Sequence, residues 1–294
     1  MTLDKELGEL HSSEFAAVIV LFNPASDFFD YLQRISKLFQ RIVLVDNSTV
    51  NVDFDIHSYT NVQVVANHKN MGIAKALNQG LEVSFASGAN YVITFDQDTR
   101  VSDEYLDFVV DNLNHSLLEK SVVGSGYKSP YQTAVGAVQA AADDSNFIWA
   151  KCTTVITSGM IISKPVYNRV GTFRDDYFID SVDQEYCLRA RKCGLVVLNS
   201  KVPIMEHKVG ESVSFVPEHS PFRKYYIFRN VLVTVKIYWA VEPMWAVKQL
   251  VRLITEFGSV VLFEKQKKAK LANMLLGVSH AFSGRMGTKD DCSE

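Results

Sequence analysis

Two aspartates, Asp96 and Asp98, stand one residue apart directly after the apolar run YVITF at residues 91–95. Such a run is typical of a buried strand. Because alternate strand side chains share a face, both carboxylates are expected on one side where the strand leaves the core. Carboxylates that close repel each other unless a cation lies between them. Paired oxygen ligands suit a hard divalent ion, Mg²⁺ or Mn²⁺, of the kind that joins carboxylates to substrate phosphates.

The elements of the first half of the chain are expected to hold these carboxylates at the edge of a sheet. Predicted strands at 16–22, 41–47, 62–67 and 91–95 alternate with helices, one capped by Ser26 and one at 72–86. This alternation predicts an α/β fold with a mostly parallel central sheet flanked by helices. Such sheets bind ligands beyond the carboxyl ends of their strands. Polar residues gather at those ends: Asn23, Asp46, Asn47, Asn67, Asp96 and Asp98.

The second half has a looser pattern. A strand interrupted by glycine is predicted at 153–163, a helix at 180–194 and a further strand at 195–207. The helix is acidic at its start, basic in its last turns and ends at Gly194. From Arg223 to about residue 270 the chain is predicted to be mostly helical, with an interruption near Pro243.

Composition indicates one large globular domain with an appendage. The chain has 294 residues, of which 47% are hydrophobic and 21% are charged. Residues 1–14 lack the apolar core of a signal peptide, and no run of 18 uncharged apolar residues predicts a transmembrane helix. The four cysteines lack CxxC spacing, which favours reduced thiols in a cytoplasmic protein over zinc or disulfides.

The net charge of −3 conceals a basic C-terminal region. Residues 221–270 carry ten Lys or Arg and three Glu, so their balance is +7 and that of the remainder is −10. Aromatic residues and spaced cations at 233–263, followed by EKQKKAK at 264–270, suit helices lying on an anionic membrane. A helical pair packed on the domain or forming a homo-oligomer is the alternative. Nucleic acid is not expected as a partner, because the basic segment is rich in aliphatic residues.

Several segments together resemble family 2 glycosyltransferases with the GT-A fold. They are VDN at 45–47, NHKNMGIAKALNQG at 67–80, DQD at 96–98 and FIDSVDQEYCLRARKCG at 178–194. Among these, GIAKALNQG, DQDT and FIDSVDQEYCLRA are most similar to the bacterial rhamnosyltransferase subgroup. The resemblance covers roughly residues 15–230 and implies a nucleotide-sugar donor. Phosphotransferases of the haloacid-dehalogenase type also carry DxD, but there it follows the first strand and not the fourth.

The resemblance implies a donor site along the strand ends. Asp46 would accept from the N3–H of a pyrimidine, Asp96 would face the ribose or sugar, and Asp98, with Asp96, would hold the metal. A helix N-terminus preceded by glycine can approach the donor closely. Arginine can grip phosphate with two hydrogen bonds. The further donor-binding candidates are Asn23, Asn67, Asn70, Gly72, Lys75, Arg223 and Arg229, and His207 is a candidate metal ligand or diphosphate contact.

Transfer to a hydroxyl also needs one carboxylate that takes the proton. In the family this base precedes a helix with the pattern Glu-Asp-Val-Asp-x-x-x-Arg, and aligning VDQEYCLR on it places the base at Asp183. Because Val182 stands where the pattern has Glu, Asp180 is the alternative. Both carboxylates can also simply complement the N-terminus of the helix.

The sequence thus predicts a metal-dependent, inverting glycosyltransferase. It would move L-rhamnose from dTDP-β-L-rhamnose to a saccharide on a polyprenyl diphosphate carrier, at the inner face of the plasma membrane. The expected division is a flexible N-terminus at 1–14, a catalytic domain at 15–222, basic amphipathic helices at 223–275 and a flexible tail at 276–294. A donor such as a UDP-hexose, or a non-catalytic module that binds nucleotide sugars, is the alternative.

Overall fold

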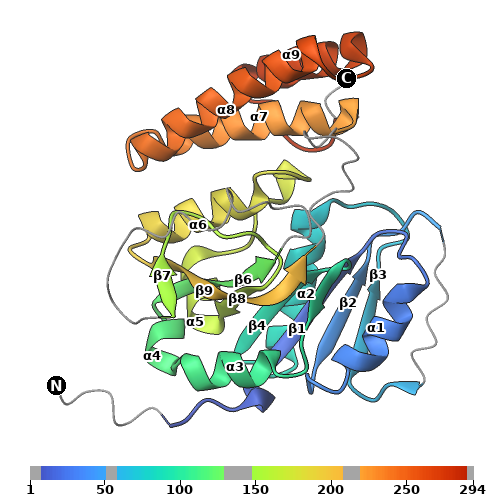
Figure 1. Cartoon of the computed structure of the whole chain (residues 1–294), viewed down its shortest axis with the longest axis vertical. Coiled ribbons are helices and arrows are strands. Elements are labelled where there is room, and N and C mark those ends of the chain that lie inside the picture. The colour runs from blue at the N-terminus through green and yellow to red at the C-terminus, as the bar shows by residue number, and fades with distance from the viewer. Residues whose placement is uncertain (1–7, 51–57, 129–147, 208–218, 290–294) are drawn as a thin grey trace.

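A computed structural model describes residues 8–50, 58–128, 148–207 and 219–289. One sheet runs through the molecule in the order β3-β2-β1-β4-β8-β6-β9-β5, and β7 pairs with β9 (Figure 1). The strands are β1 (Phe15–Leu21), β2 (Ile42–Asp46), β3 (Val62–Ala66), β4 (Tyr91–Asp96), β5 (Thr99–Val101), β6 (Ser121–Lys128), β7 (Trp149–Lys151), β8 (Met160–Ser163) and β9 (Val196–His207).

The first four strands along the chain are parallel, as predicted. β1 pairs with β2 and β4, and β2 pairs with β3, all in parallel register. β8 is antiparallel to both β4 and β6, so that β6 and β9 run in the same direction as β4. The carboxyl ends of β1 to β4 therefore lie at one edge of the sheet, which is where the sequence places its polar residues.

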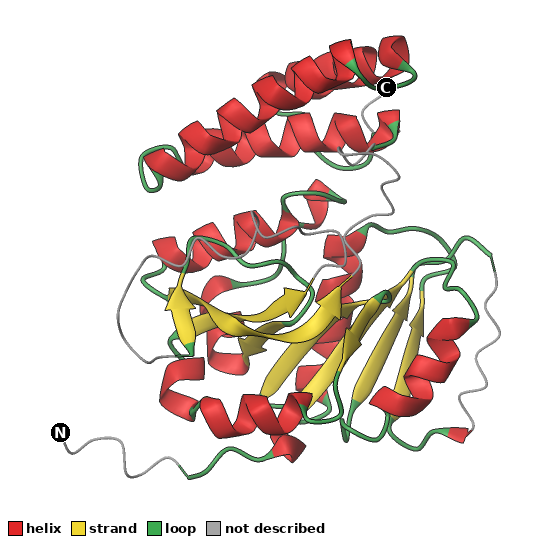
Figure 2. Ribbon diagram, viewed as in Figure 1, coloured by secondary structure: helices red, strands yellow, loops and turns green. Residues whose placement is uncertain are grey.

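Helices cover both faces of the sheet (Figure 2). One face packs against α1 and α3, and the other against α2, α5 and α6, in two separate hydrophobic clusters. The amphipathic spacing of Phe28, Tyr31, Leu32 and Ile35 buries one side of α1. The helices are α1 (Asp27–Ile35), α2 (Ile73–Ala86), α3 (Tyr105–Asn112), α4 (His115–Leu118), α5 (Lys164–Val170) and α6 (Val182–Lys192), with 3-10 turns η1 (Ser12–Glu14) and η3 (Asp175–Tyr177).

The last three helices form a layer beside α6 (Figure 1). They are α7 (Pro221–Tyr238), α8 (Pro243–Leu262) and α9 (Lys267–Ser283). α9 approaches α7 closely at Gly277, where a Cβ would stand 2.5 Å from the carbonyl oxygen of Tyr225. Buried Lys224 of α7 pairs with Glu256 and Glu264 at 2.6 and 2.8 Å, which ties α7 to α8 and the turn after it. None of the helices in the described part of the chain is long and apolar enough to cross a membrane.

Four local expectations are corrected by the structure. The strand predicted at 153–163 is reduced to β8, because Gly159 has a φ of +76° and turns the chain before Met160. Residues 276–283, predicted as tail, belong to α9, where Gly277 and Ala281 are buried. The predicted flexible N-terminus includes η1 and buried Leu10, while residues 1–7 lie outside the described part. Ser26 precedes α1 but makes no side-chain capping hydrogen bond.

The side chain of Asn78 joins α2 to the backbone of Phe173, just before η3, and this contact can be tested. Its amide donates to the carbonyl of Phe173 and accepts from the Phe173 N–H, at 2.9 and 2.8 Å. We expect Asn78→Ala to lower the free energy of unfolding by about 1–3 kcal/mol, because both buried backbone groups lose their partner. Urea unfolding would measure this, with Asn112→Ala as control, since the side chain of Asn112 bonds only within its own helix. Equal stability of the two variants would show that the hydrogen bonds between Asn78 and Phe173 do not stabilise the fold.

Candidate active site

Asp96 is the last residue of β4, and Asp98 lies on the turn that joins β4 to β5. The N–H of Asp96 donates to Ser158 Oγ at 3.2 Å. Gln97, between the two aspartates, bonds the N–H and the carbonyl of Phe22 with its side chain, at 2.8 and 3.2 Å. Arg100 donates to the carbonyl of Gln97 at 2.8 Å. The turn is therefore fixed to the end of β1 and to the segment before β8.

Asp180 and Asp183 lie at the start of α6, close to Arg223 of α7. The guanidinium of Arg223 donates to both carboxylate oxygens of Asp180, through Nε and Nη2, at 3.0 to 3.2 Å. Burial lowers the pKa of Arg223, but the carboxylates of Asp180, Asp96 and Asp183 together raise it above its ordinary value. Arg223 thus lies within electrostatic reach of Asp96, from the predicted metal site, and of both candidates for the base, Asp180 and Asp183.

The carboxyl group of Asp183 has an unusual proton affinity. Burial, with smaller contributions from the charges of Asp180 and Asp96, raises its pKa to about 6, although the N–H of Gln184 donates to it. A carboxyl group with such a pKa is able to exchange a proton near neutral pH. Because the charge of Asp96 acts on Asp183, the structure brings Asp96, at the end of β4, close to the acids at the start of α6.

The predicted pyrimidine contact, Asp46, is buried at the end of β2. One of its oxygens accepts from the N–H of Ser48 at 2.9 Å. Asn23 lies alongside it: the Asn23 N–H donates to Ser48 Oγ at 2.8 Å, and Asn23 Oδ1 accepts from the N–H of Thr49. The structure therefore brings these two candidates together at the ends of β1 and β2.

Asn67 belongs to an internal network of amides. It exchanges two hydrogen bonds with Gln79 at 2.8 Å, and it also donates to Asn47 Oδ1 at 2.8 Å. Asn47 in turn donates to the carbonyl of Gly72 at 3.0 Å. Gln79 was missed by sequence reasoning, because its partner lies twelve residues away on a different element. The network fixes the segment that leads into α2.

The N-terminus of α2 faces the segment that leads into α6. Asn70 Oδ1 accepts from the N–H of Gly72, and the N–H of Ile73 donates to the carbonyl of Phe178 at 2.8 Å. Gly72 has a φ of +83°, and a Cβ there would stand 2.6 Å from the same carbonyl oxygen, so glycine is required. Lys75, one turn further on, forms an exposed ion pair with Asp175 at 3.4 Å.

Of two further candidates, Arg229 does not lie at the strand ends, while His207 does. Arg229 is fully buried within the helical layer, and its guanidinium donates to Asn230, to the Tyr225 hydroxyl and to backbone carbonyls. This correction to the donor-binding assignment has a plain cause: the donors of Arg229 are taken up by protein acceptors. His207 ends β9 opposite Thr99, beside the Asp98 turn, and the description extends to its backbone alone.

The donor set is compatible with a divalent metal ion shared with a ligand. No group of three or more His, Cys, Asp and Glu side chains able to hold a metal occurs within the described ranges. Mg²⁺ and Mn²⁺ sites that include substrate phosphates commonly need one or two carboxylates. Asp96 and Asp98 supply that number, and the influence of Asp96 on the pKa of Asp183 reflects an excess of negative charge.

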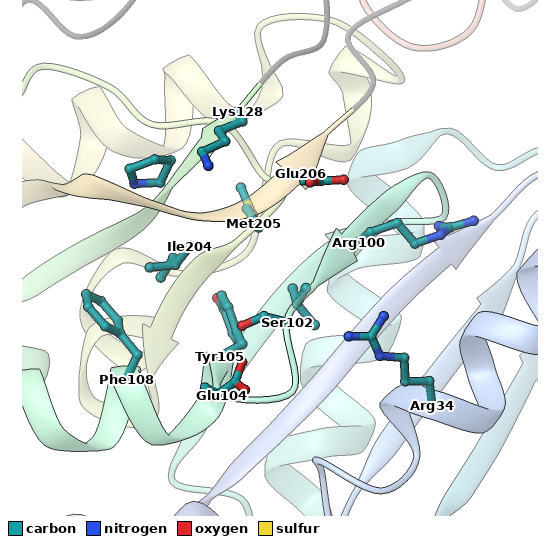
Figure 3. A pocket seen from close by; sticks show the side chains of 12 residues that line it. Arg34, Arg100, Ser102, Glu104, Tyr105, Phe108, Lys128, Ile204, Met205 and Glu206 are labelled. Atoms are coloured by element: carbon teal, nitrogen blue, oxygen red, sulfur yellow. The ribbon is translucent and has the colours of Figure 1, made fainter.

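A pocket of about 420 Å³ opens beside β5, next to this site. Figure 3 shows Phe108 and Ile204 on one side of it and Arg34 and Arg100 on the other. None of the predicted site residues lines it, although Arg100 follows Asp98 by two positions. The residues after β6 and β9, at 129–147 and 208–218, lie outside the described part of the chain.

The raised pKa of Asp183 predicts a cost to stability at high pH. Because the pKa is about 6 in the folded protein against an ordinary 3.8, the folded state binds the proton more tightly than the unfolded chain. The resulting stabilisation is present at low pH and is lost as the pH rises through 6. We expect Asp183→Asn to raise the free energy of unfolding at pH 8 by about 1–3 kcal/mol, as measured by urea unfolding. The difference from the parent protein should vanish toward pH 4.

The measurement is made with a metal chelator, so that no bound cation compensates the charge. Asp111→Asn, an exposed helix residue, is the control and should change stability by less than about 0.5 kcal/mol. A stability of Asp183→Asn equal to that of the parent at pH 8 would show that the carboxyl group is not destabilised by its surroundings.

Two comparisons of the sequence with known proteins found matches. Residues 25–141 match the family model for glycosyl transferase family 2. The dTDP-rhamnosyl transferase RfbF of Shigella flexneri is 28% identical over 293 residues, which cover 94% of this chain and 98% of the relative.

Solved structures support the fold. S. aureus TarS 1-349 in complex with UDP-GlcNAc has a TM-score of 0.58 at 15% identity, over 91% of this chain and 81% of that one. The chain spans about half, 49%, of a longer TarS structure. GalNAc-T7, crystallised with UDP, GalNAc and Mn²⁺, has a TM-score of 0.54 at 12% identity, over 94% of this chain and 56% of that one. The expected GT-A fold is confirmed, and residues 25–141 of the chain resemble glycosyl transferase family 2.

Proposed function

We propose that this glycosyltransferase moves L-rhamnose from dTDP-β-L-rhamnose to a saccharide acceptor, with inversion at the anomeric carbon. The observation that carries the proposal is the grouping of Asp96, Asp180, Asp183 and Arg223 at the carboxyl edge of a nucleotide-sugar fold. The name of the relative RfbF, a dTDP-rhamnosyl transferase that matches over nearly its whole length, supports the donor. UDP-GlcNAc in the TarS complex supports a nucleotide-sugar donor in general.

In the proposed reaction, Asp183 is the general base. Its carboxylate takes the proton of the acceptor hydroxyl while that oxygen forms a bond to the anomeric carbon and the bond to the diphosphate breaks. Asp180 is the weaker candidate, because both of its oxygens are engaged by Arg223. A pKa of about 6 leaves Asp183 mostly ionised at neutral pH while it retains useful basicity.

The donor is proposed to lie along the ends of β1, β2 and β4. Asp46 and Asn23 would contact the nucleoside, and the N-terminus of α2, with Lys75, would face the diphosphate. Asp96 and Asp98, with His207, would hold Mg²⁺ or Mn²⁺, which when bound supplies charge neutralisation for the departing nucleoside diphosphate. Mn²⁺ in the GalNAc-T7 structure supports a divalent ion in this fold.

Replacing the two acids separates catalysis from donor binding. We expect Asp183→Asn to reduce transfer at least about 1,000-fold while calorimetry shows donor affinity within threefold of the parent, since only the proton acceptor is lost. We expect Asp98→Asn to abolish the Mn²⁺-dependent part of donor binding. Retained transfer in Asp183→Asn would move the base to Asp180. A parent protein that binds the donor but transfers no sugar would instead favour the non-catalytic module.

The donor itself is tested by thermal shift with thymidine- and uridine-diphosphate sugars, with and without Mn²⁺. The largest shift should occur with dTDP-rhamnose and metal. A larger shift with a UDP-hexose would remove the rhamnose assignment and leave the glycosyltransferase assignment intact.

We also propose that the helical layer rests on the inner face of an anionic membrane, where a lipid-carried acceptor would be found. Of the 18 exposed large hydrophobic residues in the described part of the chain, 14 lie between Ile237 and Phe282. On α8 they form one stripe, at Met244, Val247, Val251, Ile254 and Val261.

The charged residues of the helical layer also suit an anionic membrane surface. Six cations are exposed around this surface: Lys236, Lys248, Arg252, Lys265, Lys267 and Lys268. The three carboxylates of this region face inward, because Glu242 pairs with Arg191, and Glu256 and Glu264 pair with Lys224. An apolar stripe flanked by a surplus of positive charge favours an anionic lipid surface over a second copy, whose cations would face these.

Vesicle sedimentation tests the membrane face. We expect binding to vesicles of equal parts phosphatidylglycerol and phosphatidylcholine, and little binding to phosphatidylcholine alone. Ile254→Ser with Phe263→Ser should weaken binding about tenfold or more, since both side chains are over 70% exposed and would insert. Val202→Ser is the control, because Val202 is an exposed apolar residue of β9 and not of the helical layer. Equal binding of the double variant and the control would refute the proposal.

A further inference from the structure

A strained turn leads into α6. Phe178, Asp180 and Ser181 all have left-handed backbone conformations, with φ of 64°, 63° and 60°. At Phe178 the ψ is −64°, and the N–H of Ile179 donates to the carbonyl of Tyr177 at 2.8 Å. This is a γ-turn of the rare, strained type. Backbone of this kind persists only where the surrounding structure holds it in place.

Two buried residues of α7 provide that support through the backbone. Asn230 Nδ2 lies 2.7 to 2.9 Å from three carbonyl oxygens, and Arg229 Nη2 donates to two at 3.0 and 3.2 Å. Both side chains are 0% exposed. The carbonyls they hold are those of Asp176, Tyr177, Ile179 and Asp180.

The orientation of the Asn230 amide is itself fixed. Its Oδ1 accepts from Arg229 Nε at 2.9 Å, so its nitrogen must face the turn. Arg229 Nη1 is anchored on the carbonyl of Gly287 at 2.7 Å and on the Tyr225 hydroxyl. Neither residue therefore has a donor left for a substrate, and their role has to be exerted through the turn.

The turn connects both halves of the candidate site. The carbonyl of Phe178 accepts from Ile73 at the N-terminus of α2, where the donor is proposed to lie. The ring of Phe178 stacks on Tyr226 of α7, with centroids 5.2 Å apart. Asp180, two residues on, is held by Arg223 of the same helix. A shift of the turn would thus move the acids before α6 relative to α2.

We propose that Arg229 and Asn230 are positioning residues of the transfer reaction, which hold the turn at 176–180 so that Asp183 faces the donor site. The inference rests on the proposed function and deepens it, because it extends the catalytic apparatus into α7. General bases must lie within hydrogen-bond reach of the proton they take, and small displacements reduce turnover strongly.

The test uses Asn230→Ala and the isosteric Asn230→Asp in the full chain. Both remove the N–H donors, so we expect kcat to fall about 100-fold while the donor Kd stays within threefold of the parent. Hydrogen exchange gives a readout that does not need turnover: the amides of Ile179 and Ile73 should exchange faster in both variants.

Glu264→Gln is the matched control. It weakens a buried ion pair of the same helical layer without touching the turn, and should lower thermal stability while leaving kcat and both amides unchanged. A normal kcat in the Asn230 variants, or an equal loss of kcat in Glu264→Gln, would overturn the inference. Failure of the proposed function is distinguishable, because the parent protein would then show no transfer, while the exchange of the two amides would still report on the turn.

Discussion

The concentration of carboxylates at one edge of the sheet is the constraint on which this structure depends. Asp96, Asp180 and Asp183 lie within electrostatic reach of one another, and Arg223 offsets only part of their repulsion. The remaining charge can be relieved by a proton on Asp183 or by a cation that binds the acids. The same excess charge that destabilises the folded protein would therefore prepare the site for the proposed proton transfer and for the proposed metal-bound diphosphate.

Strain in the backbone accompanies this electrostatic strain. The acids before α6 follow a γ-turn that no local sequence preference favours, since Phe178 is a bulky residue with a positive φ. Hydrogen bonds from α7, the aromatic contact with Tyr226 and the contact with α2 together hold it. α2 and α7, which lie more than a hundred residues apart in the sequence, thus bind the backbone carbonyls of this turn. The turn thereby positions Asp180 and Asp183.

Sequence reasoning was able to predict the parts of the fold that local chemistry decides. β1 to β4, α2 and α6 follow from hydrophobic runs, helical spacing and charged ends. The motifs selected the acids at 96, 98, 180 and 183, and their roles are proposals. It did not identify the partners of Asn67 and Arg229, because the topology supplies them: Gln79 takes up the amide of Asn67, and the carbonyls of Asp176 and Gly287 take up Arg229. A polar residue near a predicted site can therefore bond to other protein groups and fix the site instead of contacting a ligand.

The helical layer combines two demands on one sequence. Its inner side must bury Arg229, Asn230 and Lys224, and each of these has protein partners that offset the cost of burial. Its outer side leaves apolar residues such as Ile254 exposed, beside the six exposed cations. An exposed apolar surface of this extent is costly in water unless another surface covers it. Because α7 contacts the turn while α8 and α9 carry the exposed face, one helix would separate the proposed membrane surface from the proposed base. This short connection is consistent with an acceptor that reaches the site from a lipid carrier.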